Sequence, residues 1–136
     1  MYYKNPILRL AFVVLSLAVW MQAEDRAKCS NATLRGSYGM HTTGSVIGVG
    51  DFAVVGRFVF DGKGSLTAHL FIRLNGESTE LTDVTGTYSV SPDCIVNDSW
   101  GGSTHVSVIV DEGRGYFILN NTLGEGDTIS GEARRQ

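Results

Sequence analysis

The sequence predicts a single all-β domain, in which about eight antiparallel strands form a meander that closes into a barrel. Three observations support this prediction. After residue 23, apolar residues recur at every second position, and no window shows the 3.6-residue stripe of an amphipathic helix. Glycine is abundant, with 17 residues, and many of these fall between the apolar segments, as turn residues do. Eight strands are also enough to close a barrel and leave no exposed sheet edge.

The composition is that of an ordinary globular protein. Of the 136 residues, 43% are hydrophobic and 18% are charged, and the formal net charge is −3. A disordered chain would carry fewer apolar residues and more charge, and a collagen would repeat glycine at every third position. The acidic balance argues against a protein that binds nucleic acid by neutralising phosphates, so we expect no nucleic-acid partner.

Residues 1–23 have the pattern of a secretory signal peptide. Lys4 and Arg9 supply a positive start, and an apolar run over 10–21 precedes the small residue Ala23. An uncleaved membrane anchor is the alternative, but the run is shorter than the ~20 residues that a spanning helix needs. We therefore expect a cleaved signal, a single barrel domain over 24–136, a secreted or periplasmic location and no stable membrane insertion.

The predicted domain contains two cysteines, Cys29 and Cys94. In an exported protein an even number of cysteines favours a disulfide, which here would close a long loop and stabilise the fold by about 4 kcal/mol. A redox-active pair is the alternative, but such pairs usually have the C-x-x-C spacing, which is absent. Two cysteines are too few for a four-thiolate zinc site.

The clearest hairpin covers residues 52–74. Its even-numbered positions are apolar and its odd-numbered positions are mixed, so we expect the even positions to face the core. A three-residue loop over 62–64 pairs even positions with even positions, whereas a two-residue loop would mix the faces. On the outer face we expect Arg57 opposite Thr67 and diagonal to His69. The expected inner pairs are Phe60 with Leu66, Phe58 with Ala68, Gly56 with Leu70 and Val54 with Ile72.

The next turn, at Asn75-Gly76, allows two registers. A two-residue turn, which this dipeptide favours, pairs Leu70 with Leu81. One additional loop residue pairs Leu70 with Thr82 instead and keeps Asp83 outside, so we favour this second register on polarity. The side chains that it buries are Val84, Tyr88 and Val90.

The rest of the domain contains shorter segments of the same kind. The glycine-rich segment 44–50 precedes neither a helix nor a lysine, so it is not a phosphate-binding loop. We expect it to be a loop at the barrel mouth, whose Val46 and Ile47 either cap the core or act as a lid. Further strands are expected over 35–43, 94–100, 104–110, 116–121 and 126–134, with a charged turn over 111–115. Glycines within strands mark expected bends of the sheet: Gly36, Gly39, Gly56 and Gly86.

Three segments, 29–39, 56–66 and 86–94, resemble in order the sequences of a group of small exported bacterial proteins that are abundant in soil acidobacteria and largely uncharacterised. The resemblance implies a calycin-like β-barrel, similar in outline to lipocalins and to the allene oxide cyclase and dirigent barrels. It also implies a disulfide between Cys29 and Cys94. It carries over no catalytic residue, and residues 97–136 resemble no group.

No catalytic or metal-binding motif is recognisable in the chain. His41, His69 and His105 lie on different predicted strands without metal-ligand spacing, so we expect surface histidines, no metal and no cofactor. A G-x-S-x-G nucleophile elbow is absent. The acidic residues fall mostly in turns, which argues against the carboxylate pair of a glycosidase. We therefore predict no catalytic residue.

Two classes of function fit these features. The first is a barrel that holds a small hydrophobic molecule, an inference from fold class alone. The residues expected to line its interior are Phe52, Val54, Phe58, Leu70, Ile72, Tyr88 and Trp100. The second is a structural or interaction module with a filled core, which would act through outer residues: Val55, Arg57, Phe71 and Arg73.

A third class, an isomerase or cyclase of the allene oxide cyclase type, requires polar groups inside the barrel, and the inner face of 52–74 offers none. The interior volume distinguishes the first two classes. A cavity of about 300 Å³ or more favours ligand binding, whereas a solid core favours the interaction module. The sequence specifies no oligomeric state.

Overall fold

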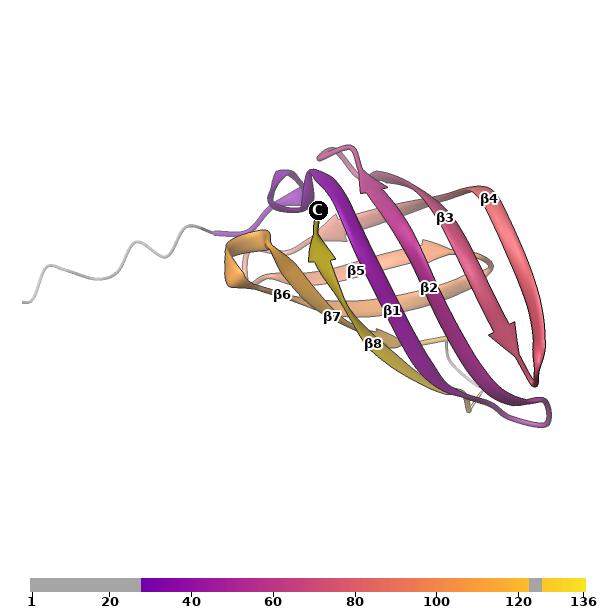
Figure 1. Ribbon diagram of the computed structural model, residues 1–136. Helices are drawn as coiled ribbons and strands as arrows, with labels where there is room; N and C mark the ends of the chain where they lie inside the picture. The colour runs from indigo at the N-terminus through magenta and orange to yellow at the C-terminus, as the bar shows by residue number, and fades with distance from the viewer. Residues whose placement is uncertain (1–27, 123–125) are drawn as a thin grey trace, which may run out of the picture.

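The computed structural model describes residues 28–122 and 126–136, which form a closed antiparallel barrel (Figure 1). The expected signal peptide, residues 1–23, lies outside the described residues. Within the described ranges, no helix is long and apolar enough to cross a membrane. The strands are β1 (Gly36–Val46), β2 (Gly50–Phe60), β3 (Ser65–Leu74), β4 (Glu77–Val90), β5 (Ile95–Trp100), β6 (Ser103–Val110), β7 (Gly115–Asn120) and β8 (Thr128–Arg135). Two short 3₁₀ helices are η2 (Asn31–Leu34) and η3 (Asp111–Gly113).

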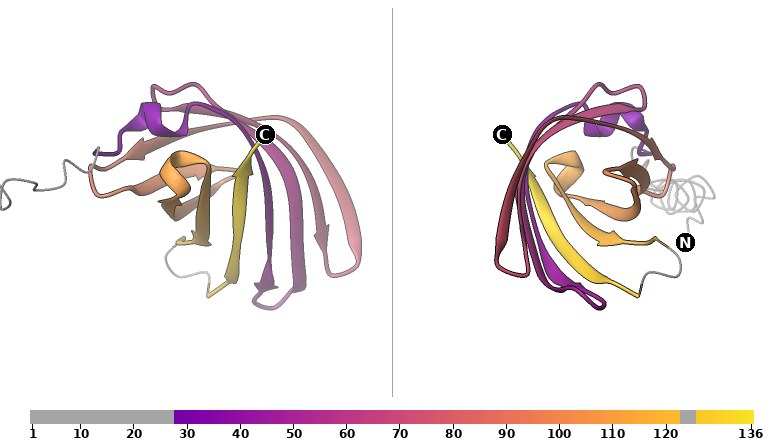
Figure 2. Two further views of the ribbon diagram at one scale, coloured as in Figure 1. Left: turned by 60° about the vertical axis from the view of Figure 1, so that its left-hand side comes forward. Right: turned by 90° about the vertical axis from the view of Figure 1, so that its right-hand side faces the viewer.

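Each strand pairs with its neighbours in sequence, and β8 returns to pair with β1. This closing pair runs from Tyr38 opposite Arg135 to Ser45 opposite Thr128. Seen from the side and along the barrel, the eight strands wrap around one interior (Figure 2). The predicted all-β meander is therefore confirmed, and its outline is consistent with the calycin-like barrel that the resemblance implies.

Glycine lets β1 and β8 approach closely where the barrel closes. A Cβ at Gly44 would lie 1.7 Å from the carbonyl oxygen of Thr128, and a Cβ at Gly131 would lie 1.9 Å from the carbonyl oxygen of His41. Any side chain at either position would force the two strands apart. Two of the glycines that the sequence assigns to bends also leave no room for a Cβ: Gly56 and Gly86.

The β2–β3 hairpin has the predicted inner register over its whole length. Its three-residue loop is held by Asp61, whose Oδ1 accepts hydrogen bonds from the backbone N–H groups of Lys63, Gly64 and Ser65. These bonds stabilise the carboxylate, the bond from Lys63 most strongly, and they lower the pKa of Asp61. Turn chemistry and hydrophobic pattern therefore specify the same register.

One expected pair on the outer face of this hairpin is wrong. Arg57 lies opposite His69 and not opposite Thr67. The confirmed register requires this, because Phe58 pairs with Ala68 and the adjacent positions must then pair with each other.

The β3–β4 hairpin contains both registers that the sequence allows. Near the turn, Leu70 lies opposite Leu81, as the two-residue turn requires. Farther along, Ala68 lies opposite Val84, as the longer loop requires. A bulge joins the two parts, and there Asp83 has a positive φ of 57°. The favoured register is thus correct only beyond the bulge. Its expected pairing of Leu70 with Thr82 is wrong.

Segment 44–50 is not the loop that the sequence predicts. β1 continues to Val46 and β2 begins at Gly50, so that only three residues form the turn. Ile47 is 68% exposed and does not cap the core. Val46 instead lines the interior cavity described below. The glycines that suggest a loop are accommodated in the strands, where Gly44 lies opposite Phe52.

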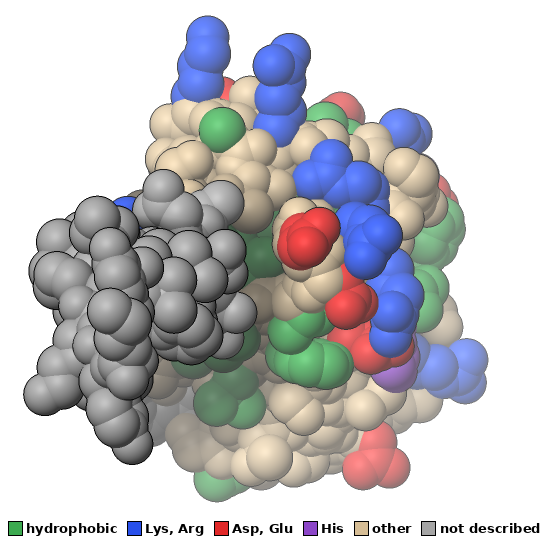
Figure 3. All heavy atoms as spheres, turned by 90° about the vertical axis from the view of Figure 1, so that its left-hand side faces the viewer, with side chains coloured by type: hydrophobic (Ala, Val, Ile, Leu, Met, Phe, Trp, Pro, Cys, Tyr) green, Lys and Arg blue, Asp and Glu red, His purple; other side chains and the backbone are tan. Residues whose placement is uncertain are grey.

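Aromatic side chains fill one end of the barrel, which we call the closed end. The rings of Tyr38 and Phe60 meet edge to face with centroids 5.5 Å apart, and those of Phe60 and Tyr88 do so at 5.0 Å. Helix η2 covers this end and is fixed to β4, because the Asn31 side chain accepts a hydrogen bond from the Val90 N–H. Figure 3 views the molecule from this side, where Lys and Arg side chains gather beside Asp and Glu side chains.

Arg135 fastens the last strand to the closed end. Its guanidinium donates hydrogen bonds to the carbonyl oxygens of Thr33, Arg35 and Gly113 and to the hydroxyl of Tyr38. The Tyr38 hydroxyl in turn donates to the carbonyl oxygen of Gly113. The final strand therefore closes the barrel through side-chain bonds as well as through the β1–β8 ladder.

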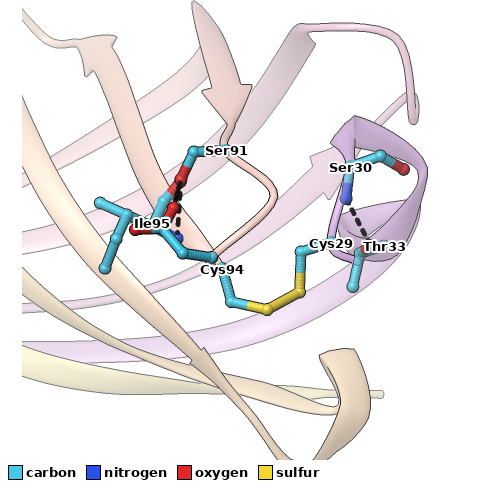
Figure 4. The surroundings of a disulfide bond; sticks show 7 residues. Cys29, Ser30, Thr33, Ser91, Cys94 and Ile95 are labelled. Atoms are coloured by element: carbon cyan, nitrogen blue, oxygen red, sulfur yellow. Dashed lines mark hydrogen bonds between the residues drawn. A yellow bond between two sulfur atoms is a disulfide. The ribbon is translucent and has the colours of Figure 1, made fainter. Parts of the chain in front are cut away.

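A disulfide joins Cys29 and Cys94 at the closed end (Figure 4). It links the segment before η2 to the turn between β4 and β5, with the two Cα atoms 5.0 Å apart. The Ser91 hydroxyl shapes this turn by accepting a hydrogen bond from the Ile95 N–H at 3.2 Å. The predicted disulfide is confirmed, and no cysteine in the described part of the chain is free.

Candidate functional site

The opposite end of the barrel, which we call the mouth, contains a cavity of about 220 Å³. The mouth is the end at which the β1–β2 and β3–β4 hairpins turn (Figure 1). The apolar wall of the cavity includes Val46, Phe52, Val54, Leu70, Ile72 and Ile118. The polar part of its wall includes Thr42, Ser103, His105, Asn120 and Asp127. One half of the barrel is thus packed and the other half is partly empty.

His105 and Asp98 form a buried pair beside this cavity. They lie opposite each other on β6 and β5, and the His105 Nδ1 is 2.9 Å from the Asp98 Oδ1. The two residues are 7% and 8% exposed. A carboxylate at Nδ1 fixes the tautomer, because Nδ1 must carry the proton that it donates. In the neutral ring Nε2 is then an acceptor, and no described residue forms a hydrogen bond with it.

Trp100 lies between the cavity and the closed end. It lines the cavity and stacks on the His105 ring, with centroids 4.1 Å apart and planes inclined by 15°. It also meets the Phe58 ring at 5.0 Å. Trp100 and Asp98 point to the same side of β5 because they are two positions apart. The β5–β6 hairpin therefore presents three side chains together, and the indole and the carboxylate hold the imidazole in one orientation.

Two other polar side chains lie deep in the barrel. Ser107 follows His105 on the inner face of β6, and its buried Oγ has no hydrogen-bond partner among the described residues. Burial raises the pKa of Tyr116 well above its ordinary value, and the Asp98 carboxylate raises it further. The interior near Asp98 therefore disfavours additional negative charge.

The structure places five of the seven predicted lining residues at the cavity: Phe52, Val54, Leu70, Ile72 and Trp100. The other two, Phe58 and Tyr88, also point inward but belong to the packed closed end. The Tyr88 hydroxyl there donates a hydrogen bond to the carbonyl oxygen of Asn31. The apolar alternation predicts whether a side chain points into the barrel. It does not predict which half of the barrel the side chain occupies, because that depends on its position along the strand.

The expectation of surface histidines is wrong for His105. His41 and His69 are exposed, and the His69 Nε2 lies 2.7 Å from the Glu80 Oε1 on the outer face. His105 instead points into the barrel. Among the residues that the structure describes, no group of three or more His, Cys, Asp or Glu side chains is arranged to hold a metal ion.

The sequence hides His105 because the outer face of β6 is more apolar than its inner face. Its valines form the more regular alternation, yet Val108 is 45% exposed, and the inner positions are His105, Ser107 and Ile109. The informative signal lies in the adjacent strand. In β5, Val96 and Trp100 alternate with the polar Asn97 and Ser99, and this pattern places Asp98 on the inner face.

The outer face of β2 and β3 carries exposed apolar side chains. Val55 is 54% exposed and Phe71 is 50% exposed. Arg57 is anchored beside them by a hydrogen bond from its guanidinium to the Ser37 hydroxyl at 3.0 Å. Val55, Arg57 and Phe71 are among the outer residues through which the interaction-module hypothesis expects contact with a partner.

Comparisons of the chain with models of protein families, with curated proteins and with solved structures found no match. The function is therefore inferred from the geometry of the chain itself.

Proposed function

We propose that this protein binds one small molecule in the mouth of the barrel. The observation that carries the proposal is the cavity of about 220 Å³, whose largely apolar wall contains the buried His105. Protein interiors are closely packed, and they bury polar groups with partners. An unfilled interior beside a ring nitrogen without a partner in the described chain is the arrangement that a ligand pocket requires.

The volume limits the size of the ligand. The cavity of about 220 Å³ does not reach the value of about 300 Å³ that we expect for ligand binding from the sequence, which is also the size at which drug-sized pockets begin. An apolar cavity of about 150 Å³ is nevertheless large enough to bind benzene. We therefore propose a single ring, or a branched chain of similar bulk, with a short polar substituent. A long acyl chain is too large to be enclosed.

The filled-core alternative describes the closed end only. There the aromatic rings of Tyr38, Phe60 and Tyr88 pack against one another, and their role is structural. A protein that needed only a stable outer surface would gain stability by packing the mouth in the same way. The cavity therefore favours ligand binding over the interaction module.

We also propose that the protein is exported and works in an oxidising compartment, with residues 1–23 removed as a signal peptide. The disulfide between Cys29 and Cys94 supports this location, because such bonds persist mainly outside the cytosol. The resemblance to small exported bacterial barrels supports it as well. N-terminal sequencing of the protein recovered from the extracellular or periplasmic fraction tests this part of the proposal.

Ligand binding is tested with two tryptophan variants of adjacent residues. Ile72→Trp fills the cavity from its wall, whereas Phe71→Trp places the same ring on the outer face of the same strand. A library of single-ring compounds is titrated into each protein and followed by NMR. We expect wild type and Phe71→Trp to bind alike, and Ile72→Trp to bind at least about tenfold more weakly. Equal binding by the two variants, or no binding compound at all, would contradict the proposal.

The isomerase or cyclase is a second candidate, and the His105–Asp98 pair is the observation that favours it. The Nε2 of neutral His105 is able to accept a proton from a bound substrate, while Asp98 stabilises the imidazolium that results. This candidate is tested by incubating a bound compound in D₂O. Deuterium entering a C–H position with wild type but not with His105→Gln would support proton transfer, and no exchange with either protein would leave binding alone.

A further inference from the structure

We propose that the cavity selects a small organic cation, such as an amine attached to a single apolar ring, over neutral or anionic molecules of the same size. This inference rests on the proposed binding function and adds the charge of the ligand to it. Three features point to a cation: the charges at the cavity, the chemistry of the His105 Nε2, and the acidic residues around the mouth.

Carboxylates dominate the charge at the cavity. Asp127 lines it at the mouth, and Asp98 lies directly behind His105. No lysine or arginine is among the described residues that line the cavity. The local charge is negative whether His105 is neutral or protonated, because one imidazolium offsets only one of the two carboxylates. In a site with low effective dielectric, this excess charge attracts a cation strongly.

Asp127 is held in place at the mouth. Its Oδ1 accepts a hydrogen bond from the Ile47 N–H at 3.1 Å, which connects the segment before β8 to the β1–β2 turn. This bond engages one of the two carboxylate oxygens, and a carboxylate accepts several hydrogen bonds. The charge of Asp127 is therefore positioned at the entrance and is able to accept a bond from a ligand.

His105 adds a complementary acceptor deeper in the cavity. Its Nδ1 is engaged by Asp98, so the neutral ring presents Nε2 as an acceptor, and the described residues supply no donor to it. An ammonium group carries only donors and satisfies such an atom. The apolar ring of the ligand would then contact the side chains of Phe52 and Trp100 in the cavity wall.

The two ends of the barrel also differ in charge. Acidic residues flank the mouth, namely Asp51 at the start of β2, Glu77 at the start of β4, and Asp127. The basic residue nearest to them in the described chain is Arg73, which lies on the outer face of β3 and donates to the Ser78 hydroxyl. Most other described basic residues lie toward the closed end, where Asp61, Asp93, Asp111 and Glu112 lie among them: Lys28, Arg35, Lys63, Arg114, Arg134 and Arg135. The negative charge around the mouth would steer cations toward it.

The inference is tested with three probes of nearly equal shape: benzylamine, benzyl alcohol and benzoate. Affinities are measured by calorimetry at low and high salt. A charge-assisted hydrogen bond is roughly twice as strong as a neutral one, so we expect benzylamine to bind roughly fivefold more tightly than benzyl alcohol, and benzoate to bind most weakly. We expect the advantage of benzylamine to shrink at high salt.

Two isosteric variants identify the source of the preference. Asp127→Asn removes the charge at the mouth, whereas Glu112→Gln removes one charge from an exposed residue at the closed end. We expect Asp127→Asn to lower the affinity for benzylamine several-fold and to leave that for benzyl alcohol unchanged. We expect Glu112→Gln to change neither.

The outcomes separate this inference from the binding function. If benzyl alcohol binds in the cavity as tightly as benzylamine, or if benzoate binds best, the preference for cations is overturned and the binding function stands. A preference for benzylamine that survives in Asp127→Asn and His105→Gln would also overturn it, because the charge would then act elsewhere. If none of the three probes binds, the inference falls together with the proposed function.

Discussion

The His105 ring lies nearly parallel to the Trp100 indole, with the two centroids 4.1 Å apart. This stack and the hydrogen bond from Nδ1 to Asp98 restrict the same ring from two directions. A ring held in this way cannot rotate to exchange its two nitrogens, so Nε2 is the nitrogen that remains for a ligand. The mouth of the barrel thus contains a polar group whose position is fixed, which would reduce the entropy lost on binding the proposed ligand.

The buried pair predicts a stability difference between two polar-to-apolar substitutions. Asp98→Ala removes the acceptor of the His105 Nδ1 and leaves a buried donor without a partner. We expect it to lower the free energy of unfolding by about 1–3 kcal/mol, measured by urea denaturation.

Ser107→Ala is the matched substitution on the same strand face. The Ser107 Oγ is buried without a partner in the described part of the chain, so its removal relieves a desolvation cost. We expect a stability equal to that of wild type or higher by up to about 1 kcal/mol. A clear loss of stability would show that this hydroxyl has a partner and that the interior is arranged differently.

The barrel closure depends on Gly131. A Cβ there would overlap the His41 carbonyl oxygen at 1.9 Å, so we expect Gly131→Ala to destabilise the fold by more than about 2 kcal/mol or to prevent folding. Gly39→Ala is the control, because its Cβ would meet only the end of the flexible Gln136 side chain at 3.4 Å. Circular dichroism melts of the two variants compare them directly, and equal melting temperatures would argue against close contact between β1 and β8.

The disulfide should supply a large part of the stability. Cys29 and Cys94 are separated by 65 positions, and loop-closure arithmetic for a loop of this length gives about 4 kcal/mol. We expect a reductant to lower the melting temperature of wild type and to have no effect on the Cys29→Ser/Cys94→Ser double variant. Peptide mapping without reduction should recover the two cysteines in one linked fragment. Two free cysteine peptides would contradict the structure.

Tyr116 predicts a loss of stability at alkaline pH. Burial raises its pKa above 10.0, and the Asp98 carboxylate adds to the increase. The unfolded chain therefore releases this proton at a lower pH than the folded one. The contribution of Tyr116 is fully present below pH 10 and is lost as pH rises toward the folded pKa. We expect Tyr116→Phe to show a shallower decline in denaturation midpoint above pH 10, and an identical decline in both proteins would contradict the burial of this hydroxyl.

The sequence correctly predicts those features for which two independent local signals, the apolar alternation and the turn chemistry, agree. In the β2–β3 hairpin, the alternation of apolar residues and the Asp61 loop select the same register, and the structure has it. The β3–β4 hairpin lacks this agreement, because the turn favours one register and polarity favours the other. The chain satisfies both by a bulge at Asp83, which neither pattern indicates alone.

The candidate site is less accessible to sequence reasoning, because it depends on which face of β6 points inward. The alternation in β6 indicates the wrong inner face, because its valines lie on the outer side while His105 and Ser107 lie on the inner side. His105 faces inward because pairing with β5 places it opposite Asp98. The division of the barrel into a packed half and a half that contains a cavity depends on side-chain packing across all eight strands, which the alternation of one strand does not encode.

The central claim is that a small molecule binds between the apolar wall of the mouth and His105, and a benzylamine titration followed by two-dimensional NMR tests it most directly. The claim predicts saturable shifts of the His105 imidazole and the Ile118 methyl resonances, with Tyr88 at the closed end and Phe71 on the outer face unmoved. Shifts confined to Phe71 and its outer neighbours, or an unchanged His105 at saturating probe, would contradict it.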